Sequence, residues 1–248
     1  MPRHNNPAAL LERPFLKLRA RDAIGAEEEQ ALRDAVSEVI DCPAGRTIIP
    51  ADREIRHSTL LLDGFLARFR DLRDGSRQIT ELHVPGDFAD LHSFTLKRLD
   101  HAVMTMSPAR IAQVPHERLT EITERFPHLT RVFWFSTNMD AAIHREWAVS
   151  LGRRTAIART AHLFCELRVR LALVGLCDGM NYALPLTQIQ LAECLGLTSV
   201  HVNRVLRDLR ERRLVEYRSG QVAILDLDGL LELADFDPGY LFLKRSPL

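Results

Sequence analysis

The sequence predicts an α+β protein with an N-terminal antiparallel β-roll of the jelly-roll kind, a long helix and a C-terminal winged helix-turn-helix. Short apolar runs broken by turn residues fill 42–115, a long apolar stretch fills 129–151, and two capped helical patterns joined by a glycine follow at 186–209. The expected parts are an N-terminal arm at 1–25, a roll with flanking helices at 26–126, a long helix at 127–152 and a winged helix-turn-helix domain at 153–248.

The first 25 residues are polar and contain proline, so we expect a loosely ordered arm. Ala26–Val39 has apolar residues on one side and predicts a short helix. In Phe65–Leu72, apolar and polar residues alternate as in a half-buried strand, and Asp74-Gly75 predicts a hairpin. The expected strands of the roll are Arg46–Ile49, Ser58–Leu62, Phe65–Leu72, Arg77–Val84, Ala102–Ser107 and Arg110–Val114.

The stretch Leu129–Leu151 is apolar along two sides and therefore needs two packing partners. One partner is the roll, and we expect the other to be the same helix of a second subunit. Burial inside a monomer is the alternative. Steps of four and three residues, typical of a coiled-coil seam, select a dimerisation set of Leu129, Phe133, Ser136, Asp140, Ile143 and Trp147.

Two helices joined by a tight turn are predicted between Leu186 and Leu209. Thr187 with Gln190 three residues later has capping-box spacing, and Gly196 can take the left-handed conformation that ends a helix. Thr198 then caps a second helix after a three-residue turn, which is the geometry of a helix-turn-helix.

The outer face of the second helix carries side chains that can read DNA bases. Asparagine pairs bidentately with adenine, arginine pairs with guanine, and valine can contact a thymine methyl group. Because a recognition helix enters the major groove with its N-terminal residues leading, the expected base readers are Ser199, Val200, Asn203 and Arg204. An ordinary solvated face, or a helix-turn-helix that contacts protein in a ligand-binding or scaffold protein, is the alternative.

A hairpin and a local basic charge support DNA binding. Two strand patterns flank Arg218-Ser219-Gly220, so we expect a wing whose turn touches phosphate. The whole chain has 33 basic and 33 acidic residues, but 152–219 holds eleven arginines against six acidic residues. A basic module inside a neutral chain is typical of a DNA contact surface.

Several other classes of protein find no support in the sequence. The longest apolar run is too short to span a membrane, and residues 1–6 lack the apolar core of a secretory signal, so we expect a cytoplasmic protein. The four cysteines form no CxxC pair, and no metal site is expected. Ser58, Ser93, Asp90 and His92 contain the groups of a catalytic triad, but no GxSxG, P-loop or HExxH motif accompanies them, so no enzyme is expected.

The order of roll, long helix and winged helix-turn-helix resembles the Crp/Fnr family of bacterial transcription regulators. Gly64, the Asp74-Gly75 hairpin, Pro85-Gly86-Asp87-Phe88 and the series from Leu191 to Leu206 carry the resemblance, which covers about Ala26 to Leu225. It implies that Arg204 contacts guanine. Val200 stands where relatives often have glutamate, so the usual half-site is expected to change there. The phosphate contacts that the resemblance and the wing together suggest are Thr187, Gln188, His201, Arg207, Arg218 and Ser219.

The sensory half departs from the family pattern. Cyclic-AMP-binding relatives have a Gly-Glu pair and an Arg-Ser pair where this chain has Asp90-Leu91 and Asp100-His101, so an anionic phosphate would meet acids instead of arginine. Residues 1–41 contain no cysteine for an iron–sulfur cluster. We therefore expect neither cyclic AMP nor a cluster, and His83, His92 and His101 show no ligand spacing. The candidate effector pocket comprises Gly86, Asp87, Phe88, Asp90, Leu91, Asp100 and His101.

The expected function is sequence-specific binding of double-stranded DNA by a homodimer that regulates transcription, with RNA polymerase as the further partner that the resemblance implies. Two helix-turn-helix modules would read a pseudo-palindrome with half-site centres about 34 Å apart. The roll is expected either to sense an effector or to serve only as a scaffold.

Overall fold

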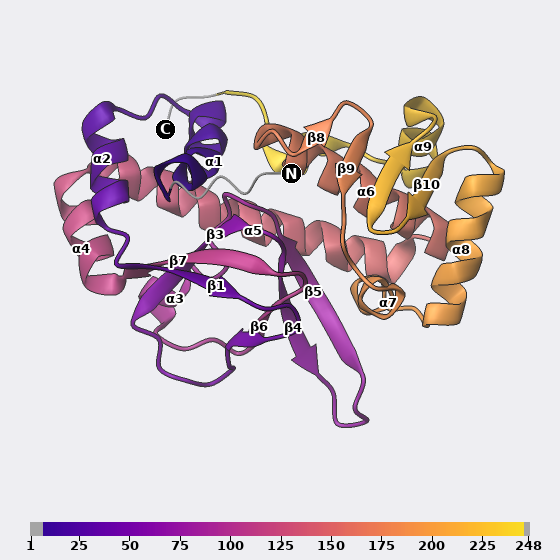
Figure 1. The fold of residues 1–248 in the computed structure, drawn as a ribbon, viewed down its shortest axis with the longest axis horizontal. Helices are drawn as coiled ribbons and strands as arrows, with labels where there is room; N and C mark the ends of the chain where they lie inside the picture. Colours follow the sequence, from indigo (N-terminus) through magenta and orange to yellow (C-terminus); the bar gives the residue numbers. More distant parts are fainter. Residues whose placement is uncertain (1–6, 246–248) are drawn as a thin grey trace. The chain divides into compact units, whose positions relative to one another are not determined.

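The computed structural model describes residues 7–245, and Figure 1 follows them from indigo to yellow. The described chain divides into two compact units. The first contains the described parts of Met1–Arg68, Leu82–Ala141 and Phe242–Leu248, and the second contains Phe69–Glu81 and Ala142–Leu241. The second unit thus includes Phe69–Glu81, which belongs to a hairpin of the roll. From Phe242 onward the described chain belongs to the first unit again.

The roll consists of two antiparallel sheets. One sheet has the order β1-β7-β3 and the other β2-β6-β4-β5. Apolar residues of both sheets, including Leu61, Leu66 and Ile111, form one buried cluster between them. The strands are β1 (Glu38–Cys42), β2 (Thr47–Ile49), β3 (His57–Asp63), β4 (Leu66–Asp71), β5 (Arg77–His83), β6 (Ala102–Thr105) and β7 (Ala109–Pro115).

Gly64 joins β3 to β4 at a point where the backbone crosses another segment closely. Its φ is +86°, and a Cβ atom placed there would lie 2.4 Å from the carbonyl oxygen of Pro108. Both the left-handed conformation and the missing side chain are therefore required at this turn.

Helices flank the roll. They are α1 (Pro7–Arg21), α2 (Ala26–Asp34), the short α3 (Ser93–Leu96), α4 (His116–Arg125) and the first half of α5 (Pro127–Arg153). Leu119 of α4 and Leu129 of α5 are fully buried in a second cluster with Val114 of β7. None of the described helices is both long and apolar enough to cross a membrane.

Three local expectations were wrong. Residues 7–21 form helix α1 instead of a loosely ordered arm, and Phe15 is only 2% exposed. The helix expected at Ala26–Val39 ends at Asp34, because the chain then pairs with β7 as strand β1. Strand β4 is not half-exposed, because Arg68 on its polar side is buried.

The second unit is built on α6 (Ala156–Leu173), whose N-cap Thr155 accepts a hydrogen bond from the Ala158 amide. A four-stranded sheet of order β10-β11-β9-β8 and helices α7, α8 and α9 complete it. Their bounds are β8 (Cys177–Asp178), β9 (Asn181–Ala183), α7 (Gln188–Leu195), α8 (Ser199–Glu211), β10 (Val215–Arg218), β11 (Gln221–Ile224) and α9 (Leu227–Ala234). The 3₁₀ turn Pro238–Leu241 ends this unit.

Candidate nucleic-acid interface

Helices α7 and α8 have the capped geometry that the sequence predicts. The Thr187 hydroxyl accepts from the Gln190 amide at 3.2 Å while the Gln190 side chain accepts from the Thr187 amide at 2.8 Å. Gly196 ends α7 with φ +59° in the left-handed region, and the Thr198 hydroxyl caps α8 through the His201 amide. The turn between the helices is therefore fixed by local hydrogen bonds.

Helix α8 has a buried side and a polar outer side. Val202 and Leu209 are 0% exposed, whereas Val200 is 78% exposed. Asn203 and Arg204 are exposed beside Val200, and Ser199 is partly exposed at the start of the helix. The face expected to read bases is therefore open to solvent within this unit. In α7, the apolar side chain of Ile189 is 64% exposed.

The wing is a tight hairpin anchored to the chain ahead of α7. Strands β10 and β11 pair antiparallel from Val215–Ile224 to Arg218–Gln221, and Ser219 and Gly220 both have positive φ. The Tyr217 hydroxyl is 2.9 Å from the Leu184 carbonyl and 2.6 Å from the Leu186 carbonyl. The exposed tip, with Arg218 and Ser219, is thus positioned by the strand that bears Tyr217.

A basic groove lies between α8, the wing and the start of α7. Its cavity volume is about 240 Å³. The lining residues are Gln188, Asn203, Leu206, Arg207, Arg210, Tyr217 and Arg218. Four of them were expected as DNA contacts. The sequence reasoning missed Arg210 and Tyr217, although Arg210 continues the spacing of Asn203 and Arg207 on one face. Thr187, His201 and Ser219 lie outside this lining.

The expected dimerisation set on α5 is corrected by the structure. Leu129 and Ile143 are 0% and 1% exposed. Phe133 packs against Phe88, and the Trp147 indole donates to Glu166 at 3.0 Å. Asp140 accepts from Arg68, and Ser136 bonds back to the Val132 carbonyl. This stripe packs inside the protomer, so it does not supply the contacts of a second subunit.

A different stripe of α5 is exposed. Its members repeat in alternating steps of three and four residues, the period of a coiled-coil seam. They are Arg131, Trp134, Asn138, Ala141, Arg145, Ala148 and Gly152. Trp134 is 69% exposed. Three of the four residues toward the C-terminal end, Ala141, Ala148 and Gly152, are small, which allows two helices to approach closely.

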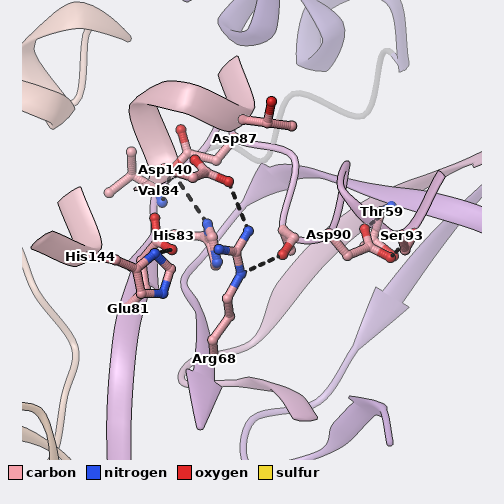
Figure 2. A network of polar contacts seen from close by, with 12 residues as sticks. Thr59, Arg68, Glu81, His83, Val84, Asp87, Asp90, Ser93, Asp140 and His144 are labelled. Carbon is pink, nitrogen blue, oxygen red and sulfur yellow. Dashed lines mark hydrogen bonds and ion pairs between the residues drawn. The ribbon is translucent and has the colours of Figure 1, made fainter. Parts of the chain in front are cut away.

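The roll contains a buried polar network around Arg68 (Figure 2). The Arg68 guanidinium donates to Asp140 at 2.8 Å and to the Ala89 carbonyl at 2.8 Å. Asp90, which is 0% exposed, accepts from the Thr59 amide, and burial raises the pKa of its carboxyl to about 7. These residues hold the segment after Gly86 against β3 and α5.

Of the residues considered for a catalytic triad, Ser93 contacts Asp90, but its histidine neighbour is His116 and not His92. The Ser93 hydroxyl lies 3.3 Å from Asp90 and 3.2 Å from Nε2 of His116, not of His92. Burial lowers the pKa of His116 to about 4. Ser58 and Ser93 are both 0% exposed, so no substrate can reach the serine hydroxyls in this arrangement.

The candidate effector residues do not share one pocket. Gly86, Phe88 and Leu91 line a small cavity against α5, and Asp87 is buried beside it. Asp90 lies inside the roll, and Asp100 forms an exposed pair with His101 at 3.0 Å, so these three residues are absent from that lining. Within residues 7–245, no three His, Cys, Asp or Glu side chains are grouped as a metal site requires.

A β-roll joined through a long helix to a winged helix-turn-helix with an open polar face defines a DNA-binding transcription regulator. Residues 158–233 match the family model of the Crp-like helix-turn-helix domain. The chain is 30% identical over 172 residues to the nitrogen fixation regulation protein FixK of Bradyrhizobium diazoefficiens, covering 67% of this chain and 69% of that protein. The chain belongs to the Crp/Fnr family of transcription regulators.

Other relatives and solved structures agree with this family. The transcriptional activator protein FnrA of Stutzerimonas stutzeri is 24% identical over 212 residues, which is 86% of each chain. The structure of FixK2 from Bradyrhizobium japonicum has a TM-score of 0.72 at 22% identity and covers 79% of this chain and 96% of that one. The c-di-GMP-responsive regulator CLP of Xanthomonas campestris has a TM-score of 0.65 at 13% identity, covering 82% and 100%. At these identities the structures confirm the expected fold alone.

Proposed function

We propose that the protein regulates transcription as a cytoplasmic homodimer whose two α8 helices read a pseudo-palindromic site in double-stranded DNA. Ser199, Val200, Asn203 and Arg204 would contact base edges. Thr187, Gln188, His201, Arg207, Arg218 and Ser219 would contact the phosphate backbone. The observation that carries the proposal is the exposed outer face of α8 beside a groove lined by three arginines.

The exposed stripe of α5 is the proposed dimer contact, in place of the buried set. A parallel pair of helices through Trp134, Ala141 and Ala148 would remove the 69% exposed indole from water. Pairing two protomers would give two copies of α8, which is what a pseudo-palindrome requires. RNA polymerase is the proposed further partner, as expected for a regulator of this family, and no catalytic step is proposed.

We propose that the roll takes neither cyclic AMP nor an iron–sulfur cluster. One cavity between the roll and α5, beside Gly86 and Phe88, has a volume of about 30 Å³. A second, beside His92 and Thr130, has about 380 Å³, but its lining contains no lysine or arginine that would neutralise a phosphate. Cys42, Cys165, Cys177 and Cys194 are free thiols and are not grouped for a cluster.

Val200 allows a direct test of base reading. Valine cannot accept a hydrogen bond, whereas glutamate at this position would accept from the N4 amino group of cytosine. Selection of bound sites from random DNA with wild type and with Val200→Glu should give sites that differ at one base pair in each half-site, with a new preference for cytosine.

The control for this selection is Leu225→Glu, which places the same charge on an exposed side chain of the second unit outside α8. It should keep the wild-type site. Binding of wild type should weaken steeply as salt is raised, because phosphate neutralisation releases counterions. Salt-independent binding, or identical selected sites for Val200→Glu and wild type, would remove the assignment of α8 as the reading helix.

A further inference from the structure

Helix α1 occupies a part of the space between the roll and α5. Pro14, Lys17 and Leu18 face Leu60 and Phe88 of the roll and Phe133 of α5 across the remaining cavity of about 30 Å³. Leu11 packs against the buried cluster of Leu60, Leu62 and Ala112. Three residues of α1 thus line this cavity, and the helix occupies the space beside it.

The strongest polar contact of α1 in this space is an ion pair with a buried carboxylate. The Lys17 ammonium bonds to Oδ1 of Asp87, whose side chain is 3% exposed. The other oxygen, Oδ2, accepts from the Val84 amide at 2.9 Å and lies 3.9 Å from Nδ1 of His83. A buried carboxylate is stabilised by a counter-charge, and Lys17 supplies one from 70 residues away in the sequence.

Further contacts hold α1 along its length. Arg13 donates to the Leu62 carbonyl and pairs with Asp63 at 2.8 Å. Arg21 lies over the Phe135 ring at 4.5 Å and donates to the Lys244 carbonyl at 3.1 Å. The helix is therefore held at Arg13, near its middle, and at Arg21, its last residue, and Lys17 lies between them.

We propose that α1 is the built-in ligand of the roll, and that the position of the Lys17 side chain is a binding subsite for a primary alkylammonium group. The subsite has an anionic floor, Asp87, and apolar walls that include Leu60 and Phe88. A molecule that takes the place of α1 must carry a positive charge on an apolar stem. An anionic nucleotide phosphate would instead face the carboxylate of Asp87.

The test is rescue of a truncated side chain by a small amine. Lys17→Ala removes three methylene groups and the ammonium, which together correspond to n-propylammonium. We expect the unfolding midpoint of Lys17→Ala to fall by about 5 °C. Hydrogen–deuterium exchange of residues 11–21 should rise at least about tenfold. Millimolar n-propylammonium should partly restore the unfolding midpoint and partly reverse the rise in exchange, because a ligand that binds only the folded state stabilises it.

Four controls make this result specific. Lys97→Ala removes an exposed lysine and should change neither readout. Neutral n-propanol should not restore Lys17→Ala, and neither should n-propylammonium in the double variant Lys17→Ala/Asp87→Asn. If Lys17→Ala does not fold, Lys17→Met keeps the volume and should show the same rise in exchange.

The proposal is overturned if Lys17→Ala behaves like Lys97→Ala, or if n-propanol rescues as well as the amine. Rescue that persists without the Asp87 carboxylate would also overturn it. All these readouts come from the first unit and need no DNA. Their failure therefore leaves the proposed DNA site untouched, and failure of the DNA site leaves this proposal standing.

Discussion

The guanidinium of Arg68 on β4 donates a 2.8 Å hydrogen bond to the carboxylate of Asp140 on α5, 72 residues further along the chain. Arg68 is 3% exposed and Asp140 15% exposed, so the pair is formed in a poorly hydrated place. Removing one partner of such a pair leaves the other buried charge with less compensation.

Asp140→Ala should therefore lower the free energy of unfolding by about 3–5 kcal/mol. Chemical denaturation measures this change. Arg70→Met, on the neighbouring exposed position of β4, is the control and should change the free energy by less than about 0.5 kcal/mol. A loss of similar size in both variants would show that the ion pair is not the cause.

Arg204→Ala should weaken binding to the preferred DNA site by about 1–3 kcal/mol and relax the preference at one base pair of each half-site. The reason is the loss of a bidentate contact to guanine. Site selection followed by competition binding measures both effects. Arg212→Ala, at the end of α8 and paired with Asp208 at 2.7 Å, is the matched control and should keep the selected sequence.

Tyr217→Phe should loosen the wing without removing apolar area. The variant loses the hydrogen bonds to the Leu184 and Leu186 carbonyls, and we expect a loss of about 1–2 kcal/mol in stability. DNA binding should weaken for all sequences alike, because the wing positions phosphate contacts. A changed base preference in the selected sites would contradict this role.

Ala141→Glu should separate a homodimer into monomers, because it places two like charges in the proposed seam of α5. Sedimentation velocity at several protein concentrations measures the mass. Ala26→Glu adds the same charge at an exposed position of α2 and should leave the mass unchanged. A dimer that survives Ala141→Glu would place the contact elsewhere.

His116 should make the roll sensitive to acid. Burial lowers its pKa to about 4, with repulsion from Lys97 and His57 as smaller causes. An unfolded histidine has a pKa of about 6.5, so between these values the unfolded state binds one more proton than the folded state. The contribution of neutral His116 to the free energy of unfolding is therefore complete above pH 6.5 and is lost as the pH falls toward 4.

The free energy of unfolding should fall by on the order of 2 kcal/mol because of His116. This fall is measured as the difference between wild type and His116→Gln in denaturation experiments across pH 4–7, which isolates His116 from other titrating groups. Parallel curves for the two proteins would contradict the assignment.

The sequence predicted the helix-turn-helix well because its signals are local. Thr187, Gly196 and Thr198 act on residues three or four positions away, so their spacing alone locates both helices. Strand β1 was missed because only Cys42 among its five residues is buried and its partner is β7.

The other differences between the sequence predictions and the structure arise from residues whose partners lie far away in the sequence. Helix α5 has two apolar stripes, and periodicity does not say which of them packs inside the protomer. From its place in the sequence, Arg68 resembles a surface residue, because its partner Asp140 lies 72 residues away. Helix α1 contains Pro14 and several charged residues, so its sequence does not by itself predict a helix. Its ion pairs with Asp63 and Asp87 help to hold it in place, and both partners lie far away in the sequence.

The seating of α1 also bears on how the protein is prepared for experiments. A purification tag fused ahead of Met1 would join the chain only six residues before a helix that packs between the roll and α5. Preparations with and without such a tag are therefore different samples of this regulator. Measurements of effector response should be made after the tag has been cleaved.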